Sequence, residues 1–424
     1  MKSIRRWCVT FLLLGLLVPA WAQTQAQTQT QTQAQTQAPR WSGTWGAAPA
    51  GPPPPARLLA FTDQTLRLVV HTSNGGERVR IRLSNEMGSA PLRIGAAHIG
   101  LRAGGAVVAA DTDRLLTFGG ARSVTIGAGA RVQSDPVALS VPALTDLTVS
   151  LFLPGASVAS TIHESALQTG YISMPGDFSG APAMPVKSTI GAWPFLTGVD
   201  VELAAPVLVA FGDSITDGLK STPNANRRWP DVLAQRLQQS AGAHEGMRVG
   251  VVNRGISSNQ LLTTEASGLL AGRAGLERYE RDVLSTPGVQ AVIVLIGIND
   301  ISYHSASAAR LVEGYRELVA RGHARGIKVI GATLLPFEGS PYYTAAREAI
   351  RQSVNQWLRA STTFDAVIDL DAGLRDPAQP TRLLPAWDSG DHLHPNDAGY
   401  QRLASLVPLH LVAPAAHRPR VRSD

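Results

Sequence analysis

After Pro206 the chain alternates short apolar runs with helical stretches, and this alternation restricts the fold more than any other feature. Five runs of strand length are apolar on both faces, as parallel strands between helices require. They predict strands at 207–211, 249–253, 291–296, 328–333 and 366–370. Helical spacing predicts helices at 229–239, 276–284, 306–325, 345–360 and 396–411. Residues 202–413 are therefore expected to form an α/β layer fold around a five-stranded parallel sheet.

Residues 41–201 carry a β pattern with no helical period. The run at 78–83 alternates strictly, with Arg on one face and apolar groups on the other. Clusters of Gly, Pro, Asn and Asp separate the runs. Strands are predicted at 65–71, 78–83, 115–118, 123–126 and 147–153. Closely spaced strands of this kind predict an all-β sandwich domain in front of the α/β domain.

The first residues have the pattern of an export signal. Lys2, Arg5 and Arg6 precede a short apolar run at 9–18, and Ala20-Trp21-Ala22 is a small-x-small cleavage site. This predicts a signal peptide at 1–22, because the apolar run is too short to span a bilayer as an anchor. The Gln/Thr-rich stretch 23–40 is predicted to be a disordered linker, and 414–424 a C-terminal tail. We therefore expect a secreted protein, periplasmic or extracellular, without stable membrane insertion.

Cysteine content and charge exclude several classes of function. The only cysteine is Cys8, inside the predicted leader, so the mature chain has no thiol for a cysteine hydrolase or a thiolate metal site. The formal charge is +6, and loss of Lys2, Arg5 and Arg6 leaves 6 − 3 = +3. The basic residues are scattered and form no block, so no nucleic-acid partner is expected.

Polar and glycine residues follow the ends of three predicted strands and precede the last helix. Ser214 lies within 212–218, Gly255 ends 253–255, and Asn299 lies within 297–300. Asp391 and His394 lie in the loop after the fifth strand. The carboxyl ends of parallel strands share one edge of a sheet, where ligands bind in such folds. We therefore expect these residues to meet there.

These residue types fit nucleophilic catalysis. A serine hydroxyl needs a base within hydrogen-bond reach, and the base needs an orienting partner. Ser214 is the predicted nucleophile, His394 its base, and Asp391 the carboxylate that fixes the imidazole tautomer. The Ser214 amide, the Gly255 amide and the Asn299 side chain are the predicted donors to the oxyanion.

Other interpretations of the same residues remain open. Each motif taken alone is more often a turn or a helix cap than a catalytic group. The segment 212–216 lacks the second glycine of a G-x-S-x-G elbow, which argues against an α/β-hydrolase. His392 and His394 together could ligate a metal, although no acidic or histidine cluster supplies further ligands.

The set of motifs resembles the GDSL, or SGNH, hydrolase family. Ser214, Gly255 and Asn299 match its serine, glycine and asparagine, and Asp391 with His394 match its D-x-x-H motif. Segments 227–230, 259–262, 281–284, 189–201 and 83–85 resemble a secreted branch with an N-terminal β-rich domain, similar to polysaccharide acetyl esterases. The resemblance implies a flavodoxin-like three-layer α/β/α domain and ester hydrolysis through an acyl-enzyme. It implies no metal and no organic cofactor.

One departure from the family pattern concerns the loop after Gly255. A Gly-Gly pair is expected after Ile256, and this chain has Ser257-Ser258 instead. The shape of the oxyanion loop is therefore open to question, although Gly255 is kept.

The leading functional hypothesis is a serine esterase for short-chain or acetyl esters, including O-acetylated polysaccharide. A lipase for longer acyl chains and a non-catalytic carbohydrate-binding protein are the alternatives. The aromatic segment 336–343 and Trp387 are expected either to line the pocket or to pack in ordinary loops. His163 is interpreted as a structural histidine, and the β-domain as a buttress for the hydrolase.

Overall fold

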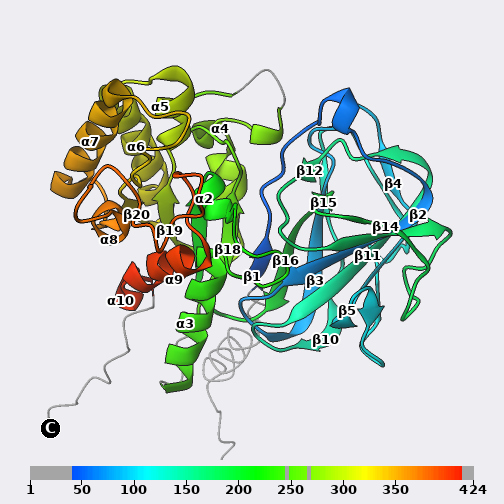
Figure 1. Ribbon diagram of the computed structural model, residues 1–424. Coiled ribbons are helices and arrows are strands. Elements are labelled where there is room, and N and C mark those ends of the chain that lie inside the picture. Colours follow the sequence, from blue (N-terminus) through cyan, green and yellow to red (C-terminus); the bar gives the residue numbers. More distant parts are fainter. Residues whose placement is uncertain (1–40, 244–247, 265–268, 413–424) are drawn as a thin grey trace, which may run out of the picture. The chain divides into compact units, whose positions relative to one another are not determined.

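The β-rich region consists of two antiparallel sheets, drawn in blue to green in Figure 1. The first sheet has the strand order β1-β16-β3-β10, with β9 also paired to β3. The second has the order β14-β13-β2-β11-β5-β6, with β7 paired to β5. The strands are β1 (Trp41–Gly46), β2 (Ala60–His71), β3 (Gly76–Ser84), β5 (Ala96–Gly104), β6 (Val107–Val108), β7 (Arg114–Leu116), β9 (Arg131–Gln133), β10 (Val137–Val141), β11 (Asp146–Val158), β13 (Gly170–Pro175), β14 (Val186–Ile190) and β16 (Leu196–Glu202). Two small pairs complete the region, β4 (Leu92–Ile94) with β8 (Val124–Ile126), and β12 (Ile162–His163) with β15 (Trp193–Pro194).

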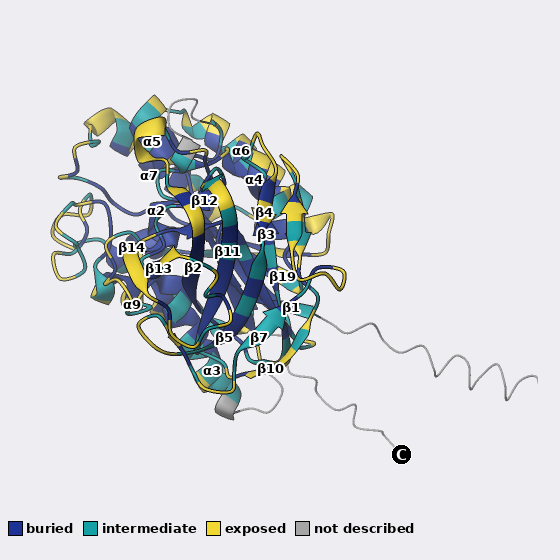
Figure 2. Ribbon diagram, turned by 90° about the vertical axis from the view of Figure 1, so that its right-hand side faces the viewer, coloured by how far each residue is buried: buried dark blue, intermediate teal, exposed yellow. Residues whose placement is uncertain are grey.

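One hydrophobic core contains side chains from both sheets. Leu66 and Leu68 of β2 and Val149 of β11 meet Val79 and Ile81 of β3 in it, and all five are fully buried. Figure 2 shows the central strands β2 and β11 largely dark blue, whereas the edge strand β14 is yellow. The prediction of a β-rich first region is confirmed, since alternating apolar positions on its strands face this shared core.

The α/β region contains a parallel sheet in the strand order β18-β17-β19-β20-β21. All four neighbouring pairs are parallel. This is the doubly wound order 2-1-3-4-5, in which the strand order reverses between the first and third strands, here between β17 and β19. The strands are β17 (Val207–Gly212), β18 (Gly250–Gly255), β19 (Val289–Leu295), β20 (Lys328–Ala332) and β21 (Ala366–Ile368). The predicted five parallel strands are confirmed.

Helices cover both faces of this sheet. Alternate residues of β17 enter two different cores: Leu208 and Ala210 pack with α3, α8 and α9, and Val209 and Phe211 pack with α4, α6 and α7. The strands are apolar throughout because both faces are covered. The helices are α2 (Ser214–Asp217), α3 (Trp229–Ala243), α4 (Gly275–Tyr279), α5 (Ile298–His304), α6 (Ala308–His323), α7 (Ala345–Ala360), α8 (Leu370–Leu374), α9 (Asp397–Leu406) and α10 (Leu409–Val412). Short η1 (Pro55–Arg57) and η2 (Leu269–Ala271) are 3₁₀ turns, and η3 (Glu280–Leu284) is a π-helical continuation of α4.

Local chemistry explains where the predicted elements were too long. The helix predicted at 396–411 ends at Leu406, because Pro408 cannot continue it, and α10 begins after the proline. The strand predicted at 366–370 ends at Ile368, because the side chain of Asp369 caps α8 by accepting the N–H of Ala372. The short helices α2, α5 and α8 were not predicted, since helices of 4, 7 and 5 residues hold too few repeats of the hydrophobic period to be recognised.

The structure describes residues 41–243, 248–264 and 269–412. The predicted signal peptide (1–22), linker (23–40) and tail (414–424) lie outside these ranges. Within them no helix has the length and apolar character needed to cross a membrane. The strand β16 ends at Glu202, beside the predicted domain boundary, and the described residues on both sides of this boundary group into one compact unit. That residues 41–201 and 202–413 are separate folding domains stays a prediction.

The two regions meet through β1 and β18. A Cβ added to Gly46 of β1 would lie 2.7 Å from the side chain of Val252 of β18. Arg254 of β18 donates from its guanidinium to the carbonyls of Ala47 (2.7 Å) and Thr197 (3.0 Å) of the β-rich region. The strand that precedes the predicted oxyanion loop is therefore packed directly against the β-rich region.

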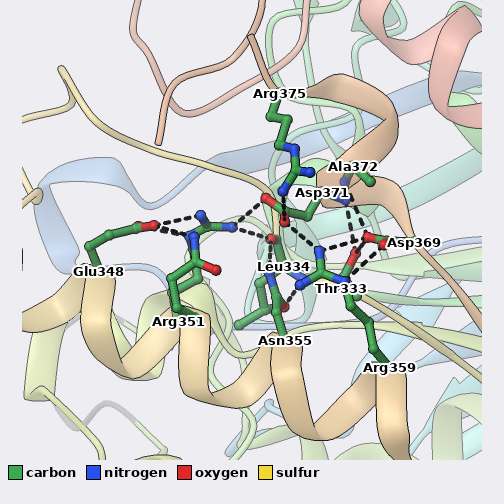
Figure 3. A network of polar contacts seen from close by, with 11 residues as sticks. Thr333, Leu334, Glu348, Arg351, Asn355, Arg359, Asp369, Asp371, Ala372 and Arg375 are labelled. Carbon is green, nitrogen blue, oxygen red and sulfur yellow. Dashed lines mark hydrogen bonds and ion pairs between the residues drawn. The ribbon is translucent and has the colours of Figure 1, made fainter. Parts of the chain in front are cut away.

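A buried polar network fixes the loop that follows β20 (Figure 3). Arg351 of α7 donates to the Leu334 carbonyl (2.8 Å), to Asp371 (2.7 Å) and to both oxygens of Glu348. Asn355, one turn later, holds the N–H and the carbonyl of Leu334, both at 2.8 Å. The side chains of Arg351 and Asp371 are both fully buried. Helix α7 therefore holds Leu334, near the start of the loop that follows β20, by hydrogen bonds to its backbone.

Replacing Arg351 with Met is expected to lower the free energy of unfolding by about 3 kcal/mol, because Glu348 and Asp371 lose a buried positive partner. Arg375→Met is the control, since its guanidinium is more exposed and 3.6 Å from Asp371, and it should cost less than about 1 kcal/mol. Urea denaturation of both variants measures the difference. If both variants lost the same free energy of unfolding, the buried contacts of Arg351 would stabilise the fold no more than the exposed contact of Arg375.

Candidate functional site

Ser214 lies at the turn from β17 to α2. Asp213 is the N-cap of this short helix, and its side chain accepts the N–H of Ile215 at 3.0 Å. Ser214 is therefore the first helical residue, and 5% of it is exposed. Its own N–H donates to no group among the described residues, as expected for the first turn of a helix. The turn presents both a hydroxyl and a free amide at the carboxyl edge of the sheet.

His394 reaches Ser214 from the loop before α9. Its Nε2 lies 2.8 Å from Ser214 Oγ, although 180 positions of sequence separate the two residues. Its Nδ1 lies 2.8 Å from an oxygen of Asp391. The other oxygen of Asp391 accepts the N–H groups of His394 (2.8 Å) and Leu393 (3.0 Å). The three residues predicted as nucleophile, base and orienting acid are thus brought together in one hydrogen-bonded chain.

The carboxylate of Asp391 determines the tautomer of His394. A carboxylate only accepts, so Nδ1 carries the hydrogen and Nε2 presents its lone pair to the Ser214 hydroxyl. Burial favours the neutral acid, but the hydrogen bonds from the His394 ring and from two backbone amides outweigh it. They hold the pKa of Asp391 below its usual range, so the carboxylate stays charged.

Gly255 does not supply the amide that the sequence analysis assigned to it. Its N–H donates to the side-chain oxygen of Asn253 at 2.8 Å. A Cβ at this position would lie 2.2 Å from the backbone nitrogen of Asp217, so glycine is needed for close packing of β18 against α2. Gly255 is therefore removed from the set of oxyanion donors, and its role is to let the two backbones approach.

Ser258 provides a free amide in the same loop. The N–H of Ile256 donates to Gly212, that of Ser257 to Asp217, and that of Asn259 to Ile256. Among the described residues, the N–H of Ser258 has no partner. Its φ of +64° places it in the left-handed region that favours glycine. The sequence signal was the Ser257-Ser258 pair at a position where the family pattern has glycine.

Asn299 is the second residue of α5 and is 4% exposed. Its Nδ2 donates one hydrogen to the Asn259 carbonyl at 2.9 Å, and an amide has two. The loop 256–259 therefore runs between the helix that carries Ser214 and the side chain of Asn299. One further Asn299 hydrogen can serve an oxyanion, as the sequence analysis predicted.

Sequence analysis missed Arg278, which is 1% exposed. Its guanidinium donates to the carbonyls of Gly212 and Arg254, both at 2.8 Å, and to the side chain of Asn259 at 2.9 Å. It thus joins the ends of β17 and β18 to the loop 256–259. Nothing in the sequence marked it, because it occupies an ordinary position on α4.

The sequence analysis left open whether the aromatic segment 336–343 and Trp387 line the site or pack in ordinary loops. Phe337 is fully buried and packs with Ile298 and Leu393, the neighbours of Asn299 and His394, with Tyr342 and Tyr343 partly buried against them. The segment 336–343 therefore lies beside the candidate site. Trp387 packs instead into the core under α9, with Arg402 over its ring at 5.6 Å.

The metal alternative finds little support in the donor geometry. Both ring nitrogens of His394 are engaged, by Ser214 and Asp391, and His392 pairs with Asp388 at 2.6 Å. Within the described ranges no group of three or more His, Cys, Asp or Glu side chains is placed to hold a metal ion.

Two buried carboxyl groups lie under the site. Burial, reinforced by the charge of Asp300, raises the pKa of Asp213 to about 7. Burial likewise raises the pKa of Asp300 to about 6, although Asp300 accepts the N–H groups of Leu261 and Leu262. Both groups therefore resist ionisation where ordinary aspartates are charged.

The α/β region is similar in sequence to proteins of a known family. Residues 210–402 match the GDSL-like lipase/acylhydrolase family. The uncharacterized esterase YxiM of Bacillus subtilis (strain 168) is 36% identical over 122 residues, which are 26% of this chain and 31% of the relative. The match thus spans less than a third of that relative's length.

Two solved structures illustrate the similarity of the chain to proteins of known structure. Est24, a carbohydrate acetylesterase from Sinorhizobium meliloti, is 16% identical with a TM-score of 0.37, covering 47% of this chain and 94% of that chain. The M. smegmatis aryl esterase is 18% identical with a TM-score of 0.37, covering 47% of this chain and 95% of that chain.

Asp213→Asn tests the buried carboxyl. Because the folded-state pKa is raised, the folded protein binds more protons than the unfolded chain between about pH 4 and 7, and stability falls as pH rises through this window. Asparagine can still cap α2 but carries no charge. The variant should exceed the wild type in free energy of unfolding at pH 8 by on the order of 2 kcal/mol, and the gap should close toward pH 4. Urea denaturation across this pH range measures it, and a constant gap would contradict the prediction.

Proposed function

We propose that the chain hydrolyses carboxylic esters through an acyl-enzyme on Ser214, a proposal supported by the match of residues 210–402 to the GDSL-like lipase/acylhydrolase family. The observation that carries the proposal is the hydrogen-bonded chain from Ser214 through His394 to Asp391, at 2.8 Å in both steps. We take its scaffold to be a flavodoxin-like three-layer domain.

In the proposed acylation step, Ser214 Oγ attacks the ester carbonyl carbon and its proton passes to His394 Nε2. The carbonyl π electrons move to oxygen and give a tetrahedral oxyanion. As this collapses, the bond to the alcohol oxygen breaks, and the imidazolium donates its proton to the leaving alcohol. Asp391 stays ionised and stabilises the transient imidazolium.

Water completes the cycle. His394 accepts a proton from the water as its oxygen attacks the acyl carbon, and a second oxyanion forms. Its collapse breaks the bond to Ser214 Oγ, which recovers its proton from the imidazolium. The acid is released and the three residues return to the hydrogen-bonded state seen in the structure.

Three groups are proposed to stabilise both oxyanions: the free N–H groups of Ser214 and Ser258 and the second amide hydrogen of Asn299. The first two support the proposal because they have no partner among the described residues, and Asn299 because only one of its two hydrogens is used. Preorganised donors of this kind act without reorganisation during the reaction.

We propose short acyl groups, such as acetyl, as the natural donors. In the described part of the α/β region, no large hydrophobic side chain is exposed, whereas the exposed ones all lie in the β-rich region: Leu58, Val107, Val158, Met174 and Val186. A lipase needs an apolar surface beside its site to engage a lipid interface. Acetyl esters of small alcohols or of polysaccharides fit this surface better than long-chain lipids.

We also propose that the protein is exported after cleavage of residues 1–22. The basic residues followed by a short apolar run and Ala20-Trp21-Ala22 support this. A non-catalytic carbohydrate-binding role is the second candidate, and the intact hydrogen-bonded chain at Ser214 argues against it.

Ser214→Ala is expected to lower kcat on an aryl acetate by at least about 10³-fold, because no other group can form the acyl-enzyme. Ser389→Ala is the matched control, since this serine lies in the same loop as His394 and its buried hydroxyl has no hydrogen-bond partner in the described structure. The control should keep the wild-type rate. Equal rates in all three proteins would remove Ser214 as the nucleophile.

Aryl esters from acetate to decanoate test the acyl preference. We expect kcat/KM to fall at least about 10-fold between acetate and octanoate, since added methylenes find no apolar site to enter. A lipase would instead keep or increase kcat/KM beyond butyrate, and that result would replace the short-chain assignment.

A further inference from the structure

Another histidine–aspartate pair joins α2 to the β-rich region. His163 of β12 belongs to the β-rich region, and Asp217 is the last residue of α2. His163 Nε2 lies 2.9 Å from an oxygen of Asp217, and its Nδ1 lies 2.9 Å from the carbonyl of Ala48. The two side chains are 5% and 4% exposed. The pair therefore bridges the two regions and is almost completely buried.

The partners of His163 fix its charge. A backbone carbonyl only accepts, so Nδ1 carries a hydrogen, and a carboxylate only accepts, so Nε2 carries one as well. The ring is then an imidazolium paired with the Asp217 carboxylate. Burial opposes this charge, but the charge and hydrogen bond of Asp217, with the Ala48 carbonyl, outweigh it and raise the pKa of His163.

Asp217 also forms hydrogen bonds with two segments of the candidate site: the turn that carries Ser214 and the loop that contains Ser257. Its N–H donates to the carbonyl of Asp213 at 2.9 Å, within the same helical turn that presents Ser214. The carboxylate oxygen that does not face His163 accepts both the N–H (3.0 Å) and the hydroxyl (2.7 Å) of Ser257. Ser257 directly precedes Ser258, whose amide is the free one of this loop.

The loop then continues to the third proposed donor. The carbonyl of Asn259 accepts from the side chain of Asn299 at 2.9 Å. A continuous set of hydrogen bonds and peptide links thus runs from His163 through Asp217 and the loop 257–259 to Asn299. All three proposed oxyanion donors are attached to it.

We propose that His163 is a positioning residue of the esterase site, by which the β-rich region holds the oxyanion loop in place. The inference rests on the proposed function. One oxygen of Asp217 accepts both hydrogen bonds from Ser257, and the other faces His163, so the position of the Ser257 backbone depends on how His163 holds this carboxyl group. Without the imidazolium, the buried carboxylate would lose its only positively charged hydrogen-bond partner among the described residues. The β-rich region then supports the proposed site through a specific charged contact with α2.

His163→Gln tests the inference, with kcat and KM measured on the aryl acetate. Glutamine can occupy the site and donate one hydrogen bond, but it carries no charge. We expect kcat to fall by roughly 10- to 100-fold, with KM changed by less than about 3-fold, because a misplaced donor weakens the transition state more than substrate binding.

His98→Gln is the matched control. His98 also pairs with an aspartate, Asp113 at 2.7 Å, and both lie within the β-rich region. The control pair is more exposed, at 17% and 30%, so His98→Gln should lose less stability in thermal unfolding than His163→Gln and should keep wild-type kcat. Equal losses of kcat in the two variants, or wild-type kcat in folded His163→Gln, would overturn the inference.

Two further variants separate positioning from general damage. In Asp217→Asn the same link is broken, so the double variant with His163→Gln should lose no more than the larger single loss. Additive losses would show that the two residues do not act through each other. Ser257→Ala removes only a hydroxyl and should fold even where His163→Gln does not, and it should lower kcat by roughly 3- to 10-fold. Unchanged kcat in Ser257→Ala would also overturn the inference.

Wild-type protein and Ser214→Ala are assayed beside these variants. Absence of Ser214-dependent turnover in the wild type would overturn the proposed function, and the positioning role with it. Ser214-dependent turnover together with wild-type kcat in folded His163→Gln would overturn the positioning role alone.

Discussion

The hydrogen bond between Ser214 Oγ and His394 Nε2 depends on two loops that the parallel sheet brings to one edge. Ser214 is held by the end of β17 and its cap Asp213, and His394 by the turn that Asp391 closes with two backbone hydrogen bonds. Each side is a short, rigid structure on a packed core. A distance of 2.8 Å across so long a stretch of sequence is therefore kept by the sheet and not by local contacts.

Several ionisable side chains are buried around the candidate site, and each must be either neutral or paired with an opposite charge. Asp213 sits uncharged under the nucleophile up to about neutral pH, whereas Arg278 remains charged because carbonyls, Asn259 and Asp282 surround it. His163 and Asp217 neutralise each other. Such groups contribute little net stability but leave few alternative arrangements for the loops they join. The loop 257–259, which carries one proposed oxyanion donor and contacts another, is held by several of these contacts.

The β-rich region contacts the α/β region at β18 and α2, next to the proposed oxyanion donors. It packs against β18 through Gly46, reaches Arg254 through two carbonyls, and sends His163 to α2. These contacts all concern the strand and helix that flank the oxyanion loop. The proposed esterase site is thus supported from one side by its own helices and from the other by the preceding sheets.

The sequence by itself predicted the five parallel strands, the β-rich region and the proposed catalytic set of Ser214, Asp391 and His394, because apolar periodicity and strand-end chemistry are local properties. It misassigned Gly255, whose amide is taken by Asn253, since the direction of an N–H depends on the backbone around it. Only the tertiary structure singled out Ser258 as the free amide and joined His163 to Asp217. Contacts between segments far apart in the sequence produce no periodic pattern in it, so they become visible only in the tertiary structure.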